Sequence, residues 1–398
     1  MKTAEGITLP TELAGNLSGD IAQDLAGSSG SRARVHVSAY LKRNGVWIAF
    51  LLLAIAATFL TDGGFISARN LTNLLRQASI NGVLAAGMTL VILHGGIDLS
   101  IGSLVALAGV GVGVSQVYWG WGAESAGMQG ALGSAALAIG IGLLAGLVNG
   151  GLVSLLGIAP FVITLGMMVI ARGLALIFSN GSSISPMGDA LTPISDAYLP
   201  LPMTAALIGL IFLGVIYGYR RKIADGLFPT IVFGLIAYSF VTYKGFPMLV
   251  VFLLASLCAI SFLLRRTTFG RSVYAIGSNE RAAVWAGVPV KRVVWIVYAI
   301  MGALAGLSGL LLTSRLNGAD PNAGQLFELD AIAAVVIGGT SLKGGSGTIM
   351  GSFIGALTIA TLNNSMDLLG VPSFYQMVFK GLIIIAAVSL DKGQRQTA

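Results

Sequence analysis

Apolar stretches separated by short polar segments fill most of this 398-residue sequence. A helix that crosses a lipid bilayer needs about 20 predominantly apolar residues. Twelve candidate stretches follow one another: 46–61, 78–94, 99–118, 131–155, 160–179, 203–219, 227–243, 247–264, 293–313, 329–340, 348–366 and 373–390. Only 10% of the residues are charged, whereas a soluble domain carries about 25%. The composition therefore excludes a soluble globular protein and a disordered one. It predicts an all-α, polytopic integral membrane protein with about 12 transmembrane helices.

Two of these regions have an irregular pattern. The stretch 329–340 is too short to cross a bilayer alone, so we expect it to be broken or re-entrant. The region 78–118 is read either as two helices or as one broken helix. Residues 95–103 (GGIDLSIGS) and 338–346 (GGTSLKGGS) are identical at five of nine positions. We interpret both as helix-breaking glycine turns near a solute pathway, without inferring symmetry from them.

The Lys and Arg residues predict the orientation, because loops that stay in the cytoplasm are enriched in them. With the N-terminus inside, 17 of the 23 Lys and Arg residues fall on cytoplasmic segments. The net charge of +7 is therefore interpreted as a topology signal, and no nucleic acid partner is expected. We expect a disordered cytoplasmic tail at 1–44, a transmembrane domain at 45–391 and a second cytoplasmic tail at 392–398.

The longest interior cytoplasmic loop, 265–292, contains a short predicted helix at 279–286. Ser278 is expected to cap its N-terminus, Glu280 complements the helix dipole, and Gly287 ends it. Two interpretations are open: a helix lying against lipid headgroups, or a docking helix for a cytoplasmic partner. The candidate docking residues are Ser278, Asn279, Glu280, Arg281, Ala282, Trp285 and Gly287.

The sequence lacks the motifs of an ATPase or another enzyme. No Lys occupies the phosphate-binding pattern G-x-x-x-x-G-K-[ST], and the glycine-rich segment 344–347 follows a Lys instead of preceding one. Cys258 is the only Cys, and His36 and His94 are the only His residues, so a His/Cys metal site is not expected. We therefore expect no catalytic residue, no metal and no cofactor.

Ionisable residues inside apolar helices are costly, so they are candidates for function. They are Asp98, Arg172, Asp330 and Lys380. The last three are expected toward the outer side, where opposite charges can pair and lock helices together. Direct contact with a solute is the alternative. A proton relay is disfavoured, because it needs several carboxylates or His residues at depth.

Uncharged polar residues within or at the ends of apolar helices form a second candidate set. They are Asn149, Thr164, Thr361, Asn363 and Asn364. Amide and hydroxyl groups provide donors and acceptors at low desolvation cost, which suits a neutral polyhydroxylated solute. Each can equally be an interhelical hydrogen bond. Together with Asp98, they are the candidate substrate pathway.

Four separated segments resemble one known family. They are GMTLVILHGGIDLSIGSLVAL (87–107), PFVITLGMMVIARGLAL (160–176), RRTTFGRSVYAIGSNERAAVWAGV (265–288) and ELDAIAAVVIGGTSLKGGSGTIMGSFIGAL (328–357). They look like the membrane subunits of bacterial monosaccharide ABC importers, and the resemblance extends over residues 45–391. It implies a type II-like permease that binds no ATP and forms a homodimer on ATP-binding cassette ATPase subunits. It also implies that a periplasmic binding protein delivers the sugar and that 265–292 is the cytoplasmic coupling loop.

The region 203–264 holds three apolar stretches where ribose-type members of this family have one. This extra hairpin makes the chain look most like a D-xylose permease, although GGID at 95–98 is nearer the ribose-type pattern. The resemblance therefore implies import of D-xylose through the bacterial inner membrane by alternating access, with both termini cytoplasmic. Ribose, arabinose or another monosaccharide or polyol is the alternative, and a secondary transporter or a channel is a remoter one.

Overall fold

The computed structural model describes residues 44–219 and 223–396. Within these residues the chain is almost entirely helical, which confirms the predicted all-α membrane class. The tail expected at 1–44 lies outside the described residues except for its last residue, and so does the basic turn at 220–222. Each of the twelve apolar stretches coincides with one helix, α3 and its π-helical continuation counting as one.

In chain order the helices are Asn44–Leu60, α2 (Ala68–Leu93), α3 (Ile101–Gly113), which the π-helix η1 (Val114–Tyr118) continues, α4 (Gly127–Leu156), α5 (Pro160–Phe178), α6 (Pro193–Asp196), α7 (Leu201–Tyr219), α8 (Ile223–Thr242), α9 (Met248–Arg266), α10 (Thr268–Ser278), α11 (Glu280–Trp285), α12 (Val290–Leu316), α13 (Phe327–Ile337), α14 (Ile349–Leu368) and α15 (Ser373–Gln396). Strands β1 (Tyr198–Leu199) and β2 (Phe246–Pro247) pair antiparallel. Among the described residues, seven helices are long and apolar enough to cross a bilayer: α2, α3 with η1, α4, α5, α7, α9 and α12.

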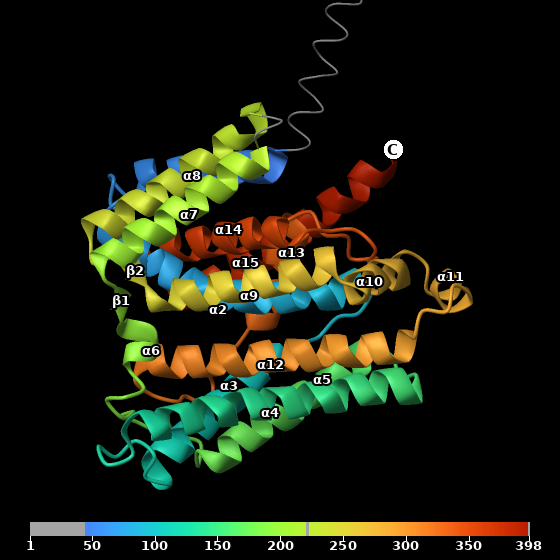
Figure 1. Ribbon diagram of the computed structural model, residues 1–398, viewed down its shortest axis with the longest axis horizontal. Helices are drawn as coiled ribbons and strands as arrows, with labels where there is room; N and C mark the ends of the chain where they lie inside the picture. The colour runs from blue at the N-terminus through green and yellow to red at the C-terminus, as the bar shows by residue number, and fades with distance from the viewer. Residues whose placement is uncertain (1–43, 220–222, 397–398) are drawn as a thin grey trace, which may run out of the picture.

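The long helices lie side by side, with their axes roughly along one direction (Figure 1). Helices α10 and α11 lie at one end of this bundle, and α6 with the strands β1 and β2 lies at the other. We refer to these as the α10–α11 end and the β1–β2 end. Helix α15 runs toward the α10–α11 end (Figure 1).

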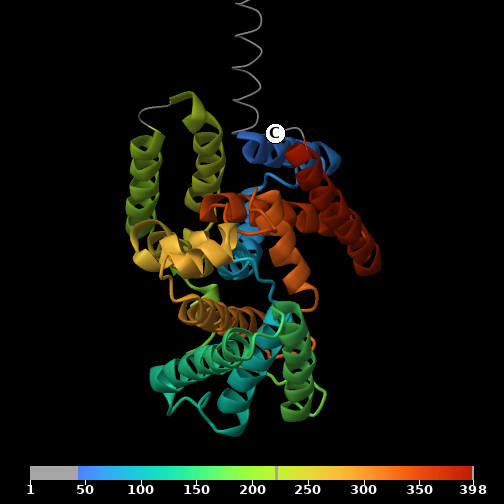
Figure 2. The ribbon, with the colours of Figure 1, turned by 90° about the vertical axis from the view of Figure 1, so that its right-hand side faces the viewer.

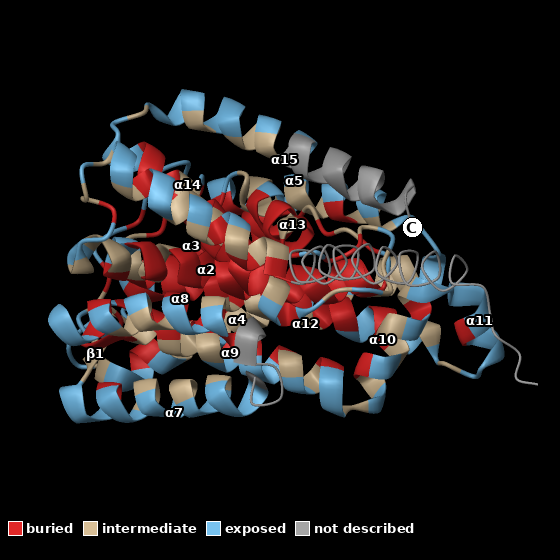
Figure 3. Cartoon of the chain, turned by 90° about the horizontal axis from the view of Figure 1, so that it is seen from above, coloured by how far each residue is buried: buried red, intermediate tan, exposed pale blue. Residues whose placement is uncertain are grey.

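Seen from the α10–α11 end, the helices form two groups (Figure 2). One contains α3, α4 and α5, and the other contains α2, α9, α13 and α14 with the hairpin α7–α8 beside it. Helix α12 joins the groups, because it contacts α3 and α4 on one side and α2 on the other. Among the seven candidate spans, α2 is the most enclosed, with 89% of its most apolar segment buried, and it lies in the centre of the molecule (Figure 3).

Glycines allow α4 and α12 to pack backbone against backbone. A Cβ atom on Gly142 would overlap the carbonyl oxygen of Gly302, and one on Gly302 would overlap that of Gly142. A Cβ atom on Gly306 would likewise overlap the carbonyl oxygen of Ala138. Small residues permit this close approach in membranes, where packing rather than water exclusion holds helices together.

Both irregular regions are broken at glycines, as the sequence predicts. Helix α2 ends at Leu93 and α3 begins at Ile101, with Gly95 at a φ of +93° between them. Helix α13 has only 11 residues, so it rises about 16 Å, and the segment 338–348 connects it to α14. The two related glycine segments therefore occupy equivalent places, each between two apolar helices.

Candidate functional site

The break between α2 and α3 carries a fully buried carboxylate, that of Asp98. Its Oδ1 accepts hydrogen bonds from the backbone N–H of Ser100 (2.9 Å) and from the Ser100 hydroxyl (2.6 Å). The side-chain amide of Asn149, on α4, donates to the Ser100 oxygen at 3.1 Å. The break thus brings Asp98 and Asn149 together, with Ser100 as the residue between them.

Two further side chains contact the same break through the carbonyl oxygen of Ile97. The Thr164 hydroxyl, on α5, lies 3.4 Å from it, and the Tyr298 hydroxyl, on α12, lies 3.5 Å from it. We define Asp98, Ser100, Asn149, Thr164 and Tyr298 as the break cluster. Tyr298 was not predicted, because an aromatic residue in a long apolar helix is an ordinary core residue.

The break cluster contains acceptor atoms without a donor. Asp98 Oδ2 and Asn149 Oδ1 are buried and have no hydrogen-bond partner among the described residues, and the same holds for Nε2 of the neighbouring His94. Buried polar atoms are normally paired, so such a group of exceptions marks a place where another molecule can supply the donor. Solute hydroxyls are donors of this kind.

The polar residues of α14 form a separate cluster. Asn364 and Asn70, from α2, exchange two side-chain hydrogen bonds of 2.8 and 3.0 Å. Asn363 contacts Asp330, whose carboxylate forms a 3.0 Å ion pair with Lys380 of α15. For Asn364 the structure therefore shows the interhelical hydrogen bond that the sequence left open. Asn70 was missed, because it lies in the first turn of α2, outside the predicted apolar stretch.

Of the three charges expected toward the outer side, Asp330 and Lys380 form a pair, and Arg172 does not join them. The Arg172 guanidinium, on α5, donates to the carbonyl oxygens of Pro321 and Ala323 instead. Arg172 therefore fastens the segment that precedes α13 to α5. This contact could not be predicted, because backbone carbonyl acceptors are not visible in the pattern of charged residues.

The predicted loop helix is present as α11, but its cap differs from the prediction. Asn279 has the extended backbone conformation of an N-cap, with φ −162° and ψ 101°, and its Oδ1 accepts from the N–H of Ala282 at 3.0 Å. The prediction of Ser278 as the cap is wrong, since Ser278 ends α10 and its hydroxyl donates to the carbonyl oxygen of Tyr274. Glu280 lies in the first turn and Gly287 follows the helix at a φ of +78°, as expected.

Helix α10 was not predicted, although its signals are present in the sequence. The Thr267 hydroxyl oxygen caps it by accepting from the N–H of Gly270 at 3.2 Å. Gly270, Val273 and Ile276 form its buried face at a spacing of three residues. A capping Thr before a three-residue apolar repeat is a helix signature.

Helix α11 extends furthest from the bundle at its end (Figure 1). Trp285 is 86% exposed, and the neighbouring Val284 is 54% exposed. An exposed Trp next to a second apolar side chain is typical of a protein or membrane contact surface. The candidate docking residues therefore lie together on one exposed helix and its flanks.

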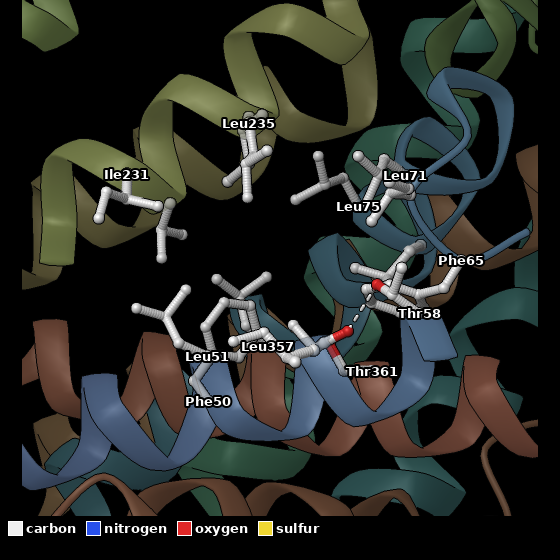
Figure 4. A pocket seen from close by; sticks show the side chains of 16 residues that line it. Phe50, Leu51, Thr58, Phe65, Leu71, Leu75, Ile231, Leu235, Leu357 and Thr361 are labelled. Carbon is white, nitrogen blue, oxygen red and sulfur yellow. Dashed lines mark hydrogen bonds between the residues drawn. The ribbon is translucent and has the colours of Figure 1, made fainter. Parts of the chain in front are cut away.

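A cavity of about 280 Å³ lies between helix Asn44–Leu60, α2, α8 and α14. Its lining is apolar apart from Thr58 and Thr361 (Figure 4). Thr361 is fully buried, and its hydroxyl has no hydrogen-bond partner among the described residues. A site for a polyhydroxylated solute needs several placed polar groups, so this cavity does not suit one. Because Thr361 lines this cavity, it lies apart from the break cluster.

Comparison with known proteins places these features in a family. The model of a family described as "Branched-chain amino acid transport system / permease component" matches residues 70–388. The ribose import permease protein of Bacillus subtilis is 39% identical over 363 residues, which cover 90% of this chain and 95% of that protein. No solved structure matches the chain significantly.

Xylose permeases are equally similar. The xylose transport system permease protein of Haemophilus influenzae is 39% identical over 374 residues, covering 88% of this chain and 97% of that protein. The corresponding protein of Escherichia coli K12 is 37% identical over 366 residues, covering 87% and 91%. The chain therefore belongs to the ribose and xylose family of ABC sugar-importer permeases, as a multi-pass membrane component of a transport system rather than an enzyme.

Proposed function

We propose that this chain is the permease subunit that carries a monosaccharide from the periplasm to the cytoplasm by alternating access, driven by separate ATPase subunits. The observation that carries this proposal is α11, a capped helix that extends from the bundle and exposes Trp285. A family permease needs a surface on which the ATPase can act, and no other described helix extends so far from the bundle end.

The proposed orientation places the α10–α11 end in the cytoplasm of a bacterium, with the protein in the inner membrane. Six Lys and Arg residues between Arg265 and Arg292 support it, because basic loops stay inside. The first described helix, Asn44–Leu60, runs toward the β1–β2 end, and α15 runs toward the α10–α11 end, so both termini are proposed to be cytoplasmic (Figure 1).

The proposed docking surface consists of α11 and its flanks, from Ser278 to Gly287. Glu280 and Arg281 offer one charge of each sign, and Trp285 offers a large apolar contact. ATP is proposed to bind only to the partner subunit, so this chain needs no cofactor, metal or catalytic residue. Two copies of the chain are proposed to form a homodimer on the ATPase subunits.

The proposed solute contacts are those of the break cluster, Asp98, Asn149 and Thr164. Their support is the group of buried acceptors without donors at a helix break. Thr361 and Asn363 belong to the candidate pathway only through their position on α14, and Asn364 is proposed to hold α14 to α2. Arg172, Asp330 and Lys380 are proposed to have structural roles, which their contacts support.

D-xylose is the proposed sugar, and the hairpin α7–α8 is the feature that favours it. Ribose and arabinose are the alternatives, because ribose and xylose permeases are equally similar to the chain. The test compares a panel of pentoses and hexoses. For each sugar, the stimulation of ATP hydrolysis by the reconstituted complex with its binding protein is measured. Stimulation by ribose but not by xylose would overturn the assignment of D-xylose and leave the proposed permease function intact.

The docking proposal is tested with the double variant Glu280→Ala/Arg281→Ala. Uptake is expected to stop while insertion into the membrane stays normal. The matched control is Glu124→Ala/Arg69→Ala, which removes one exposed charge of each sign near the β1–β2 end. Uptake that persists without ATP would support a channel or a secondary transporter instead.

A further inference from the structure

The two helix breaks contact each other, although they lie far apart in the sequence. The backbone N–H of Gly345, in the segment between α13 and α14, donates to the carbonyl oxygen of Leu93, the last residue of α2, at 2.9 Å. A helix ends with carbonyl oxygens that have no partner within the helix. One break therefore supplies a donor that the other break requires.

The last turn of α10 rests on this junction. A Cβ atom on Gly277 would overlap the carbonyl oxygen of Leu93 and crowd the nitrogen of Gly345. Only a glycine allows α10 to lie this close. Helix α10 thus contacts both breaks with its backbone, so a displacement of α10 cannot leave the junction unchanged.

A second contact joins α10 to the α13–α14 segment. The Tyr274 hydroxyl donates to the carbonyl oxygen of Gly347 at 2.9 Å. Burial raises the pKa of this hydroxyl above its ordinary value, and the charge of Arg265 partly opposes the rise. The hydroxyl is therefore protonated, and available as a donor, throughout the neutral pH range.

Helix α10 is also joined to α11. The N–H of Asn279, which caps α11, donates to the carbonyl oxygen of Ala275 in α10 at 3.0 Å. A force applied to the exposed surface of α11 is therefore passed to α10. On the other side of the junction, Leu93 is followed within a few residues by Asp98 of the break cluster.

We propose that α10 transmits the movement of the ATPase to the two helix breaks, with Gly277 and Tyr274 as the positioning residues of that transmission. The inference rests on the proposed function. It assigns docking to α11 and transmission to α10. Movement of α10 would shift both breaks together and so change the surroundings of Asp98.

The test measures the number of sugar molecules imported per ATP hydrolysed, using the full chain reconstituted with its ATPase and binding protein. Tyr274→Phe is expected to lower this ratio about fivefold, the equivalent of one ordinary hydrogen bond. Binding of the ATPase, measured by co-purification, is expected to be unchanged. Tyr238→Phe, an exposed Tyr on α8, is the matched control.

Gly277→Ala is expected to lower the ratio further, and Gly214→Ala on α7, where an added Cβ meets nothing within 4 Å, is its control. If Gly277→Ala does not fold, Tyr274→Phe decides the question. An unchanged ratio in Tyr274→Phe, which includes an equal fall in uptake and hydrolysis, would overturn the inference, and so would a loss of ATPase binding. A wild-type complex without ATP-dependent uptake would instead overturn the proposed function.

Discussion

The N–H of Gly345 donates a 2.9 Å hydrogen bond to the carbonyl oxygen of Leu93 and so joins the two helix breaks of the protein. The junction depends on backbone conformations that side chains disfavour. Gly345 has a φ of +73°, and an added Cβ would lie 2.5 Å from the Ser278 hydroxyl oxygen.

Gly345→Ala is therefore expected to lower the thermal stability of the detergent-solubilised protein. The backbone conformation costs about 1–2 kcal/mol, and crowding against Ser278 adds about 1–3 kcal/mol. Gly339→Ala is the control, because Gly339 also has a positive φ, of +84°, but no atom within 4 Å of an added Cβ. Equal losses in the two variants would show that the junction is not tightly packed.

The contact between α4 and α12 predicts a second stability difference. Gly142→Ala should destabilise the protein by about 1–3 kcal/mol, because the new methyl group overlaps the backbone of α12. Gly140→Ala, on the same helix but with open space at its Cβ, should have little effect. Unfolding temperatures of the two variants check this, and a larger loss for Gly140→Ala would contradict the packing.

The ion pair between Asp330 and Lys380 predicts a coupling energy. Asp330 is buried, so Lys380→Ala leaves an unpaired buried carboxylate and should cost about 3–5 kcal/mol. The double variant Asp330→Ala/Lys380→Ala should cost less than the sum of the single ones. Unfolding of the four proteins measures the coupling, and strict additivity would show that the pair contributes nothing.

The N-cap of α11 predicts a difference between neighbouring residues. Asn279→Ala should destabilise α11 by about 1 kcal/mol and weaken binding of the ATPase about fivefold. Ser278→Ala should have a smaller effect, because the Ser278 hydroxyl donates within α10 and caps nothing. Titration of each variant with the ATPase subunit gives the two dissociation constants, and the reverse order would restore Ser278 as the cap.

The break cluster and the α14 cluster predict different transport kinetics. Asn149→Ala removes the donor to Ser100 and a free acceptor, so it should raise the KM for sugar uptake about fivefold. Asn364→Ala, which breaks the pair with Asn70, should lower stability and leave KM unchanged. Uptake measured across sugar concentrations tests both, and an unchanged KM in Asn149→Ala would remove it from the pathway.

The helices and their breaks could be predicted from the sequence because both are local features. Apolar length predicts a span, and paired glycines predict where the α2–α3 and α13–α14 segments break. The contact between Leu93 and Gly345 could not be predicted, because a glycine turn does not indicate which distant backbone group it will meet. Figure 1 shows how the folding of the whole bundle brings the two breaks to the same end.

Side-chain partners were predicted less well than helices. The pairing of Asp330 with Lys380 follows from opposite charges, whereas Arg172 binds backbone carbonyl oxygens that have no sequence signature. The exchange of Ser278 for Asn279 as the cap has a local cause. Both residues are good caps, and the choice depended on α10, whose last residue is Ser278.

The most direct test of the proposed function is uptake of labelled D-xylose into proteoliposomes that contain this chain and its ATPase subunit, with the binding protein outside and nucleotide inside. Accumulation of sugar is expected with ATP, and none with a non-hydrolysable ATP analogue. Accumulation without ATP, or ATP hydrolysis by the purified chain alone, would contradict it.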